Sequence, residues 1–228
     1  LRQACADFSF HGWFNELHNF CAVDLSAFYF DIRKDALYCD AADSIRRRAA
    51  RTVMDILLDA LCKWLAPFAC FTAEEAWLTR HPSDDDSVHL HTFPAIPAEW
   101  RDDALAAKWI QVRAVRRVVT GALEGERVAK RIGSSLQANP ALYLTGPAAQ
   151  AVADLDMAEI CITSGLMMIE GAAPEGAFTL ADAPGIGVVP RAAEGGKCQR
   201  CWKVLPEVGH HAHDGVCGRC SDAVAKQG

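Results

Sequence analysis

Apolar residues recur at three- and four-residue steps through much of residues 10–131, a spacing that puts them on one face of an α-helix. The pattern predicts helices over 10–32, 42–65 and 103–131. Ser9 is a candidate N-cap for the first, and Asp43 or Ser44 for the second. The apolar face expected for the second helix comprises Ile45, Ala49, Val53, Ile56, Leu57, Ala60, Leu61 and Trp64. That of the third comprises Leu105, Trp109, Val112, Val115, Val119 and Leu123.

The helical pattern breaks at Pro67, since proline cannot continue a helix without losing a hydrogen bond. Thr72 to Glu75 reads Thr-Ala-Glu-Glu, a capping box, so we expect a short helix to begin there, with Phe71 as its hydrophobic staple. Residues 88–93 favour an extended segment.

A different pattern follows residue 131. Short runs of β-branched and apolar residues predict strands over 141–145, 158–163, 178–180 and 186–190. A helix is expected over 147–155 because Pro147 suits its first turn. These elements predict a small α/β module.

The last forty residues contain few apolar positions but two Cys-x-x-Cys pairs separated by fifteen residues. This spacing is typical of zinc sites, in which four thiolates at about 2.3 Å complete a tetrahedral shell. We therefore expect a zinc ion bound by Cys198, Cys201, Cys217 and Cys220. A four-thiolate shell leaves no open position for catalysis, so the expected site is structural.

Two other interpretations of the cysteine pairs are weaker. A thioredoxin-type redox motif requires a βαβ context, which the flanking Lys, Gln, Pro and Gly residues do not favour. Histidines between the pairs could replace a cysteine, but four cysteines already fill the shell. Those histidines, expected to form a polar loop, are His210, His211 and His213.

The tail has too little apolar surface to offset the entropy of ordering it, so metal binding has to supply the folding energy. Cations lie beside the ligands at Lys197, Arg200, Lys203 and Arg219. An aromatic ring next to cations is typical of surfaces that stack unpaired RNA bases, so Trp202 is a candidate RNA contact. The sequence alone equally permits Trp202 to cover the metal and the cations to be a solvated rim.

Charge is unevenly distributed along the chain. The net formal charge of the 228 residues is −6, with −7 on residues 1–104, −1 on 105–182 and +2 on 183–228. An acidic body with a basic end argues against a general nucleic-acid coat and favours a local anionic partner. The arginines at 46–48 and Arg51 fit a solvated face paired with nearby aspartates, with an RNA contact as the alternative.

Cysteine usage favours a reducing compartment, hence a cytoplasmic location. Six of the ten cysteines are scattered singly through apolar segments, as reduced and mostly buried thiols would be. No apolar run approaches the length of a membrane helix. The chain lacks both an initiating Met and a signal-peptide core, so we expect it to be a piece of a longer protein.

No catalytic constellation can be assembled from the sequence. There is no Walker A loop, and Pro190 occupies the position where a dinucleotide-binding loop needs its last glycine. Zinc-protease and nucleophile-elbow signatures are also absent. By itself the chain fits a binding module.

Several runs resemble bacterial isoleucyl-tRNA synthetases, in the family's order from about residue 7 to the end. The clearest run is Asp24 to Asp31, which reads Asp-Leu-Ser-Ala-Phe-Tyr-Phe-Asp. The others are Arg48–Thr52, Trp64–Pro67, Phe71–Trp77, Ile132–Leu136 and Lys197–Trp202. The valyl and leucyl relatives share the helix bundle, but the first run and the zinc tail resemble the isoleucyl branch.

The resemblance implies a mainly α fold in three domains. These would be an anticodon-binding helix bundle over 1–104, a helix plus small α/β junction module over 105–189, and a four-cysteine zinc-binding domain over 190–228. In the family pattern Arg200 and Trp202 contact the anticodon region. We include Lys203, Arg219, Arg48 and Arg51 as further candidate RNA-binding residues.

The implied function is tRNA anticodon recognition within a class I isoleucine–tRNA ligase, which uses ATP to attach isoleucine to tRNA-Ile. The family's two ATP-binding signatures and its editing insertion are missing, so we expect no activity from this piece alone. The expected partners are tRNA-Ile and the catalytic body of the same chain, in a monomer without membrane contact. Two alternatives stay open: a structural zinc module packed on the bundle, and a free-standing zinc-ribbon protein that binds another nucleic acid or a protein.

Overall fold

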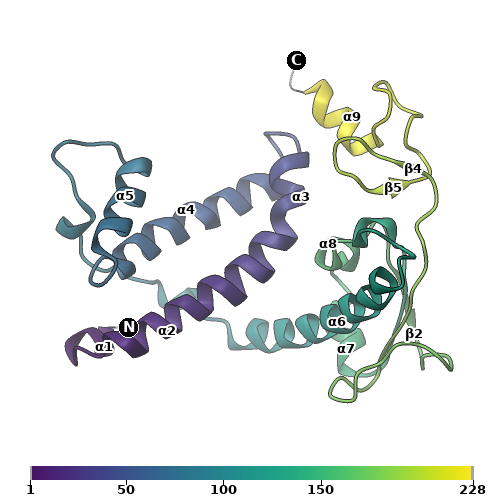
Figure 1. Ribbon diagram of the computed structural model, residues 1–228, viewed down its shortest axis with the longest axis horizontal. Helices are drawn as coiled ribbons and strands as arrows, with labels where there is room; N and C mark the ends of the chain where they lie inside the picture. Colours follow the sequence, from purple (N-terminus) through teal and green to yellow (C-terminus); the bar gives the residue numbers. More distant parts are fainter. Residues whose placement is uncertain (1, 227–228) are drawn as a thin grey trace. The chain divides into compact units, whose positions relative to one another are not determined.

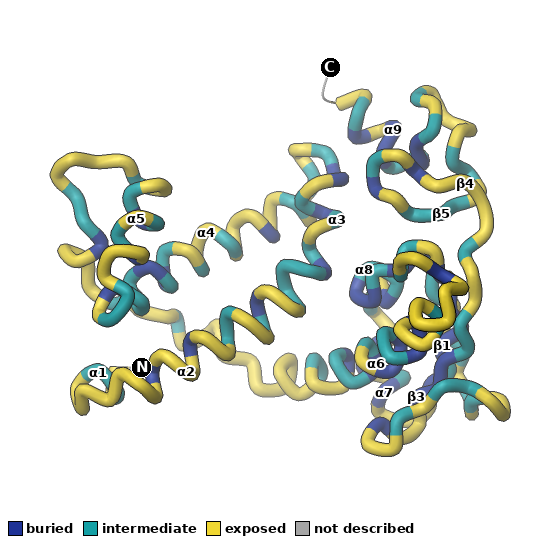
Figure 2. Tube along the Cα trace, in the orientation of Figure 1, coloured by how far each residue is buried: buried dark blue, intermediate teal, exposed yellow. Residues whose placement is uncertain are grey.

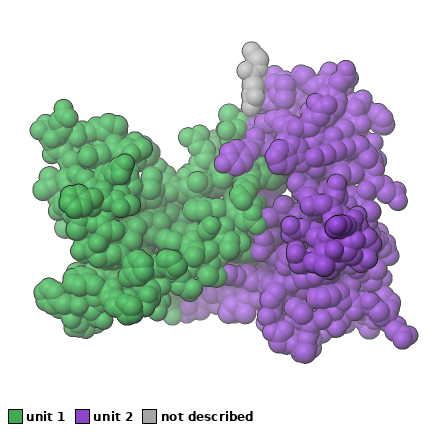
Figure 3. Space-filling view, in the orientation of Figure 1, with its two compact units in different colours: residues 1–37, 42–101 green, residues 38–41, 102–228 purple. Residues whose placement is uncertain are grey.

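The computed structural model describes residues 2–226 and divides into two units. Unit 1 contains residues 1–37 and 42–101, and unit 2 contains 38–41 and 102–228 (Figure 3). The fold is mainly helical with small sheets, as expected (Figure 1). Within the described residues, no helix combines the length and apolar character needed to cross a bilayer.

Unit 1 begins with α1 (Arg2–Ala6), and the helix predicted over 10–32 is confirmed and extends to Cys39. Helix α2 (Phe10–Asn19) continues without a break through the π-helical segment η1 (Phe20–Phe30) into α3 (Asp31–Cys39). Ser9 does occupy the N-cap position, but its side chain makes no capping hydrogen bond. Trp13 is buried and meets the Phe68 and Phe93 rings edge-on at 5.5 Å.

Helix α4 (Ile45–Leu65) is confirmed, with the Ser44 side chain accepting a hydrogen bond from the Arg47 N–H. The prediction that its apolar face is buried is wrong for much of the helix. Ile45, Val53 and Ile56 are exposed, whereas the buried positions of α4 are Ala50, Ala60 and Cys62. The reason is tertiary: the buried cluster that α4 shares with α5 and η2 includes Cys62, near the C-terminal end of α4, and does not include Ile45, Val53 or Ile56.

Helix α5 (Cys70–Arg80) begins two residues before the predicted capping box. Ala69 is its N-cap, and Phe71 is 92% exposed, so neither the box nor the staple forms. The chain leaves α4 through a tight turn in which the Ala69 N–H bonds to the Leu65 carbonyl, and this turn sets the earlier start. The helix buries Ala73 and Trp77.

The expected extended segment at 88–93 instead opens with a 3-10 turn, η2 (Val88–Leu90). Ser87 caps it by accepting the His89 N–H, and the Glu74 carboxylate accepts the Val88 N–H at 2.8 Å. These side-chain acceptors satisfy the backbone locally, without a partner strand. A second short turn, η3 (Ala98–Trp100), precedes unit 2.

Unit 2 is organised around α6 (Asp103–Val128), whose start is fixed by the Asp102 side chain accepting the Leu105 N–H at 2.8 Å. Its predicted inner face is confirmed over the middle of the helix and fails at exposed Leu105. The buried positions are Val112, Val115, Val118, Val119, Ala122 and Leu123. Figure 2 shows this buried stripe against the sheet region.

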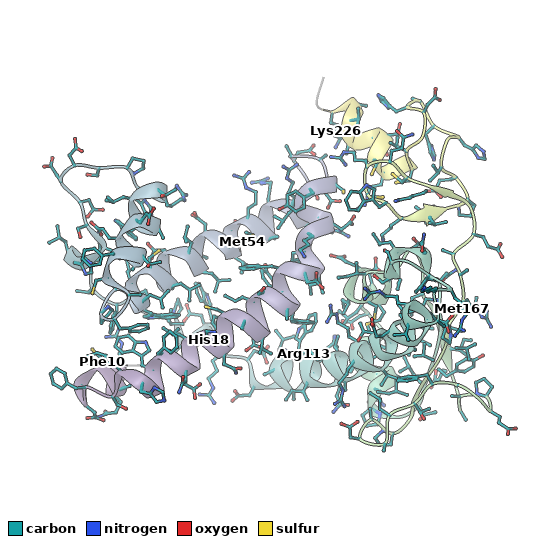
Figure 4. All side chains as sticks on the ribbon, in the orientation of Figure 1. Phe10, His18, Met54, Arg113, Met167 and Lys226 are labelled. Carbon is teal, nitrogen blue, oxygen red and sulfur yellow. The ribbon has the colours of Figure 1, made fainter. Side chains whose placement is uncertain are left out.

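A three-stranded sheet packs on α6. Strand β1 (Ala141–Leu144) is central, with β2 (Met167–Glu170) parallel on one side and β3 (Ile186–Val189) antiparallel on the other. Met167, labelled in Figure 4, starts the edge strand β2 and is exposed. Strands β1 and β3 match the prediction, whereas β2 was not predicted.

The segment predicted as a strand at 158–163 is instead helical. Helix α8 (Met157–Cys161) follows α7 (Pro147–Val152), and the Asp156 side chain caps it by accepting the Glu159 N–H at 3.0 Å. A local cap and burial against α6 outweigh the β propensity of the run. Of the expected strand at 178–180, only a bridge between Phe178 and Val188 forms.

The remaining elements are short. The turn η4 (Ser135–Gln137) follows α6, and a small hairpin pairs β4 (Gly196–Lys197) with β5 (Val204–Leu205). Helix α9 (Gly218–Ala225) comes last and ends before Lys226, which is labelled in Figure 4. The division expected at residues 104 and 189 stays a prediction.

Candidate metal centre and nucleic-acid interface

Four cysteine sulfurs converge at the end of unit 2. The Sγ atoms of Cys198, Cys201, Cys217 and Cys220 all lie within 4.8 Å of one another, and all four residues are buried. Zinc–sulfur bonds of about 2.3 Å in a tetrahedron place sulfurs about 3.8 Å apart. The Cys201 and Cys217 sulfurs are 3.8 Å apart. The donor set fits a closed zinc site, as predicted.

Local structure presents each cysteine pair. The first pair lies in the turn of the β4–β5 hairpin, where the Cys198 N–H bonds to the Lys203 carbonyl at 2.8 Å. The second pair spans the start of α9, with Cys217 as its N-cap. The Cys217 N–H points at the Cys198 sulfur, 3.4 Å away. Backbone donors therefore face the sulfurs, as a thiolate cluster requires.

The pKa values of the cysteine thiols differ widely within the cluster. Burial opposes ionisation of Cys198, but the backbone N–H groups of Cys201 and Cys217 help to lower its pKa to about 6. Burial raises the pKa of Cys201 to about 11 and raises that of Cys220 further. Cys201 and Cys220 therefore stay protonated near neutral pH by themselves, so zinc binding would displace their protons.

The histidines of the intervening loop lie outside the four-sulfur group, in line with the sequence analysis. His213 Nδ1 lies 2.9 Å from the Ser221 hydroxyl, a contact that supports the start of α9. His210 and His211 are exposed.

Trp202 lies beside the metal ligands with its ring outward. Its side chain is 60% exposed, which contradicts the interpretation of this residue as a cover over the metal. The backbone at Trp202 is left-handed, with φ of 65°, and its N–H bonds to the Cys198 carbonyl at 2.9 Å. Lys197 Nζ is 5.8 Å from the centre of the ring. The turn around the metal thus presents a flat ring with an adjacent cation.

The other candidate RNA contacts in unit 2 differ from Trp202. Lys203, the residue after Trp202 in the chain, is half-buried. Arg200 donates to the carbonyl oxygens of Tyr38, at 3.1 Å, and Cys39. Arg219 donates to the Asp40 carboxylate at 3.0 Å. Both guanidinium groups are engaged inside unit 2, and the RNA-binding roles of all these residues stay predictions.

Arg48 and Arg51 belong to unit 1 and are exposed on α4. Of their neighbours, Arg46 lies 3.9 Å from Asp35, a long contact that agrees with the expected pairing of this run with aspartates. An RNA contact by Arg48 and Arg51 stays a prediction.

One residue that the sequence analysis missed joins the metal module to the rest of unit 2. The buried Ser164 hydroxyl donates to the Leu136 carbonyl and accepts the Val204 N–H at 2.7 Å. Ser164 follows the mispredicted segment 158–163, and no motif marks it. Cys39 and Asp40 were also missed as neighbours of the metal ligands.

Comparisons with known proteins agree with this arrangement. A model of the anticodon-binding domain of tRNA ligases matches residues 1–142, and one of a zinc finger found in FPG and IleRS matches residues 195–223. An isoleucine–tRNA ligase of Ruegeria pomeroyi is 53% identical over 98% of this chain and 23% of its own length. One from Brucella abortus is 56% identical over 92% of the chain and 22% of its own length. The chain spans under a quarter of these relatives.

Proposed function

Because the chain belongs to the family of anticodon-binding domains of tRNA ligases, we propose that it recognises tRNA-Ile as the anticodon-binding and zinc-finger region of an isoleucine–tRNA ligase. The observation that carries the proposal is the pairing of this domain with a zinc finger whose four cysteines converge. ATP-dependent attachment of isoleucine to tRNA-Ile is then the activity of the longer enzyme. This region contributes RNA binding and has no adenylation or aminoacylation activity alone.

Binding would use a stacking platform and dispersed cations. The exposed Trp202 ring has the geometry to stack an unpaired anticodon base, with Lys197 and Lys203 available for the adjoining phosphates. Arg48 and Arg51, exposed on α4, would neutralise further phosphates. A zinc ion held by the four cysteines would be structural, and Cys198 and Cys201 would fix through it the turn that carries Trp202. The scattered reduced thiols fit a cytoplasmic enzyme.

The alternative is a zinc module that serves only as scaffold. The engagement of Arg200 and Arg219 with residues 38–40 favours that role for these two side chains. The exposure of Trp202 favours RNA contact, since a purely structural aromatic residue gains by burial. The two roles therefore belong to different residues of one module.

The test is binding of the zinc-loaded chain to unmodified tRNA-Ile and to a non-cognate tRNA across a salt series. We expect preference for tRNA-Ile, and its loss when the metal is chelated. Trp202→Ala should weaken binding with little change in salt dependence, because a stacked base carries no counterion. Log affinity falls as log salt concentration rises, and Arg48→Ala or Arg51→Ala should each make this slope less steep by about 0.7–0.9.

Arg191→Ala is the matched control, since this arginine is exposed in unit 2 outside the proposed contacts. Equal binding of both tRNAs, with no effect of Trp202→Ala or chelation, would contradict recognition by the zinc module. If the chain were a free-standing zinc-ribbon protein, it would bind an unrelated nucleic acid more tightly than it binds tRNA-Ile.

A further inference from the structure

The two metal-binding loops share a second feature besides their cysteines. Each reads Cys-x-Arg-Cys, with an arginine directly before the second ligand: Arg200 in the first loop and Arg219 in the second. Both arginines reach the same short segment, Tyr38 to Asp40, which belongs to unit 2 although its chain neighbours belong to unit 1.

Arg200 acts at the end of a helix. Its Nη2 donates to the Tyr38 carbonyl at 3.1 Å and its Nη1 to the Cys39 carbonyl, and these are the last two residues of α3. The final carbonyls of a helix lack partners within it and carry its negative dipole end. A guanidinium fork is suited to both, so Arg200 caps α3 from the metal module.

Arg219 acts on the next residue. Its Nη1 lies 3.0 Å from Asp40 Oδ1, and the Asp40 side chain is only 8% exposed. A buried carboxylate is costly unless a cation accompanies it. The pairing therefore makes the position of Asp40 depend on the start of α9, where Arg219 lies.

Residues 38–40 in turn close over the metal ligands. Cys39 is buried in the same cluster as the four cysteines, and its sulfur lies 3.8 Å from the Arg200 carbonyl. Arg200 Nη1 also lies 3.8 Å from the Cys220 sulfur, so one guanidinium spans a metal ligand and the helix end. Contacts of this kind around metal ligands orient them and tune their affinity.

We infer that Tyr38–Asp40 is a non-contiguous part of the metal module, held by Arg200 and Arg219 as positioning residues, and that zinc occupancy and the order of this segment are linked. A zinc ion held by Cys198, Cys201, Cys217 and Cys220 would fix the distance between the two Cys-x-Arg-Cys loops, and with it the positions from which both arginines meet adjacent residues. The linkage does not rest on the proposed function.

The experiment is hydrogen exchange of the whole chain, with and without zinc, combined with the rate of zinc transfer to a coloured chelator. Chelation should raise exchange at residues 36–40 about tenfold or more together with 198–220, while α5 in unit 1 stays unchanged. Arg200→Ala, loaded with zinc, should raise exchange at 36–40 and speed zinc release by about tenfold. Arg200→Lys should restore part of both, and Arg191→Ala should alter neither.

Asp40→Asn tests the linkage from outside the cysteine loops and guards against misfolding of the arginine variants. It should also speed zinc release and raise exchange at 36–40. Unchanged exchange at 36–40 on zinc removal would overturn the inference. So would an Arg200→Ala chain that loses tRNA affinity with normal zinc release and exchange, because Arg200 would then be an RNA ligand. Exchange and zinc release are measured without RNA, so failure of the proposed function leaves the linkage test intact.

Discussion

Unit 2 contains two cores built on different principles. Between α6 and the sheet, the core is aliphatic, with Val112, Leu142 and Val188 fully buried. In the metal module, the buried cluster is mainly cysteine, with Val216 as its one buried aliphatic residue among those described. The first core is stabilised by apolar surface removed from water, and the second by metal–thiolate bonds. A short chain segment can thus fold beside a conventional core without enlarging it.

Removing one ligand should have the largest effect. Cys217→Ser breaks the four-sulfur shell, so the metal module should lose a zinc contribution of about 10–16 kcal/mol and unfold. The aliphatic core should persist, with its own melting transition. Zinc stoichiometry and circular dichroism measure the two outcomes, with Cys70→Ser as the control because Cys70 is exposed and not a ligand. A Cys217→Ser chain that retains one tightly bound zinc would contradict the four-cysteine site.

Truncating a side chain of the aliphatic core should destabilise that core and leave the metal module intact. Leu142→Ala creates a cavity at a fully buried site on β1, at a cost of about 2–5 kcal/mol in the free energy of unfolding. The zinc stoichiometry should stay at one, because the ligands do not depend on this side chain. Leu90→Ala, at a 73% exposed site, is the control for thermal denaturation. Loss of zinc from the Leu142→Ala chain below its melting temperature would mean that the two cores fold as one.

Ser164 tests the connection between the cores. Ser164→Ala removes the acceptor of the Val204 N–H and the donor to the Leu136 carbonyl, at a cost of about 1–3 kcal/mol. Hydrogen exchange should rise on both sides of the connection, in η4 and in β5. Ser9→Ala should be silent, since the Ser9 side chain makes no capping bond. A rise confined to one side would show that the hydroxyl supports only that core.

The smallest effect on folding is expected at Trp202. Because its ring is mostly exposed, Trp202→Ala should change the unfolding free energy by no more than about 0.5 kcal/mol. Its effect on tRNA binding should be larger, about 1–3 kcal/mol, the usual loss of a stacked base. Thermal denaturation and binding titration of the same sample separate the two. A large drop in melting temperature would instead assign Trp202 to the core of the metal module.

The sequence by itself determined the features that depend on local spacing. The position of α6 follows from its apolar stripe and the Asp102 cap, and the zinc ligands follow from the two cysteine pairs. The isoleucyl family resemblance rested on contiguous runs, and the comparisons confirm it. Each of these signals lies within a few residues or one repeated motif, so no long-range contact is needed to interpret it.

Only the tertiary structure decided what depends on partners distant in sequence. The apolar stripe of α4 resembles that of α6, yet Ile45 and Val53 are exposed because the described residues of unit 1 do not cover them. The β propensity of residues 158–163 predicts a strand because it measures the fit to a sheet, but the Asp156 cap and packing on α6 make the segment helical. Arg200 and Cys39 are 161 residues apart in the chain, yet the fold of the metal module places the Arg200 guanidinium on the Cys39 carbonyl.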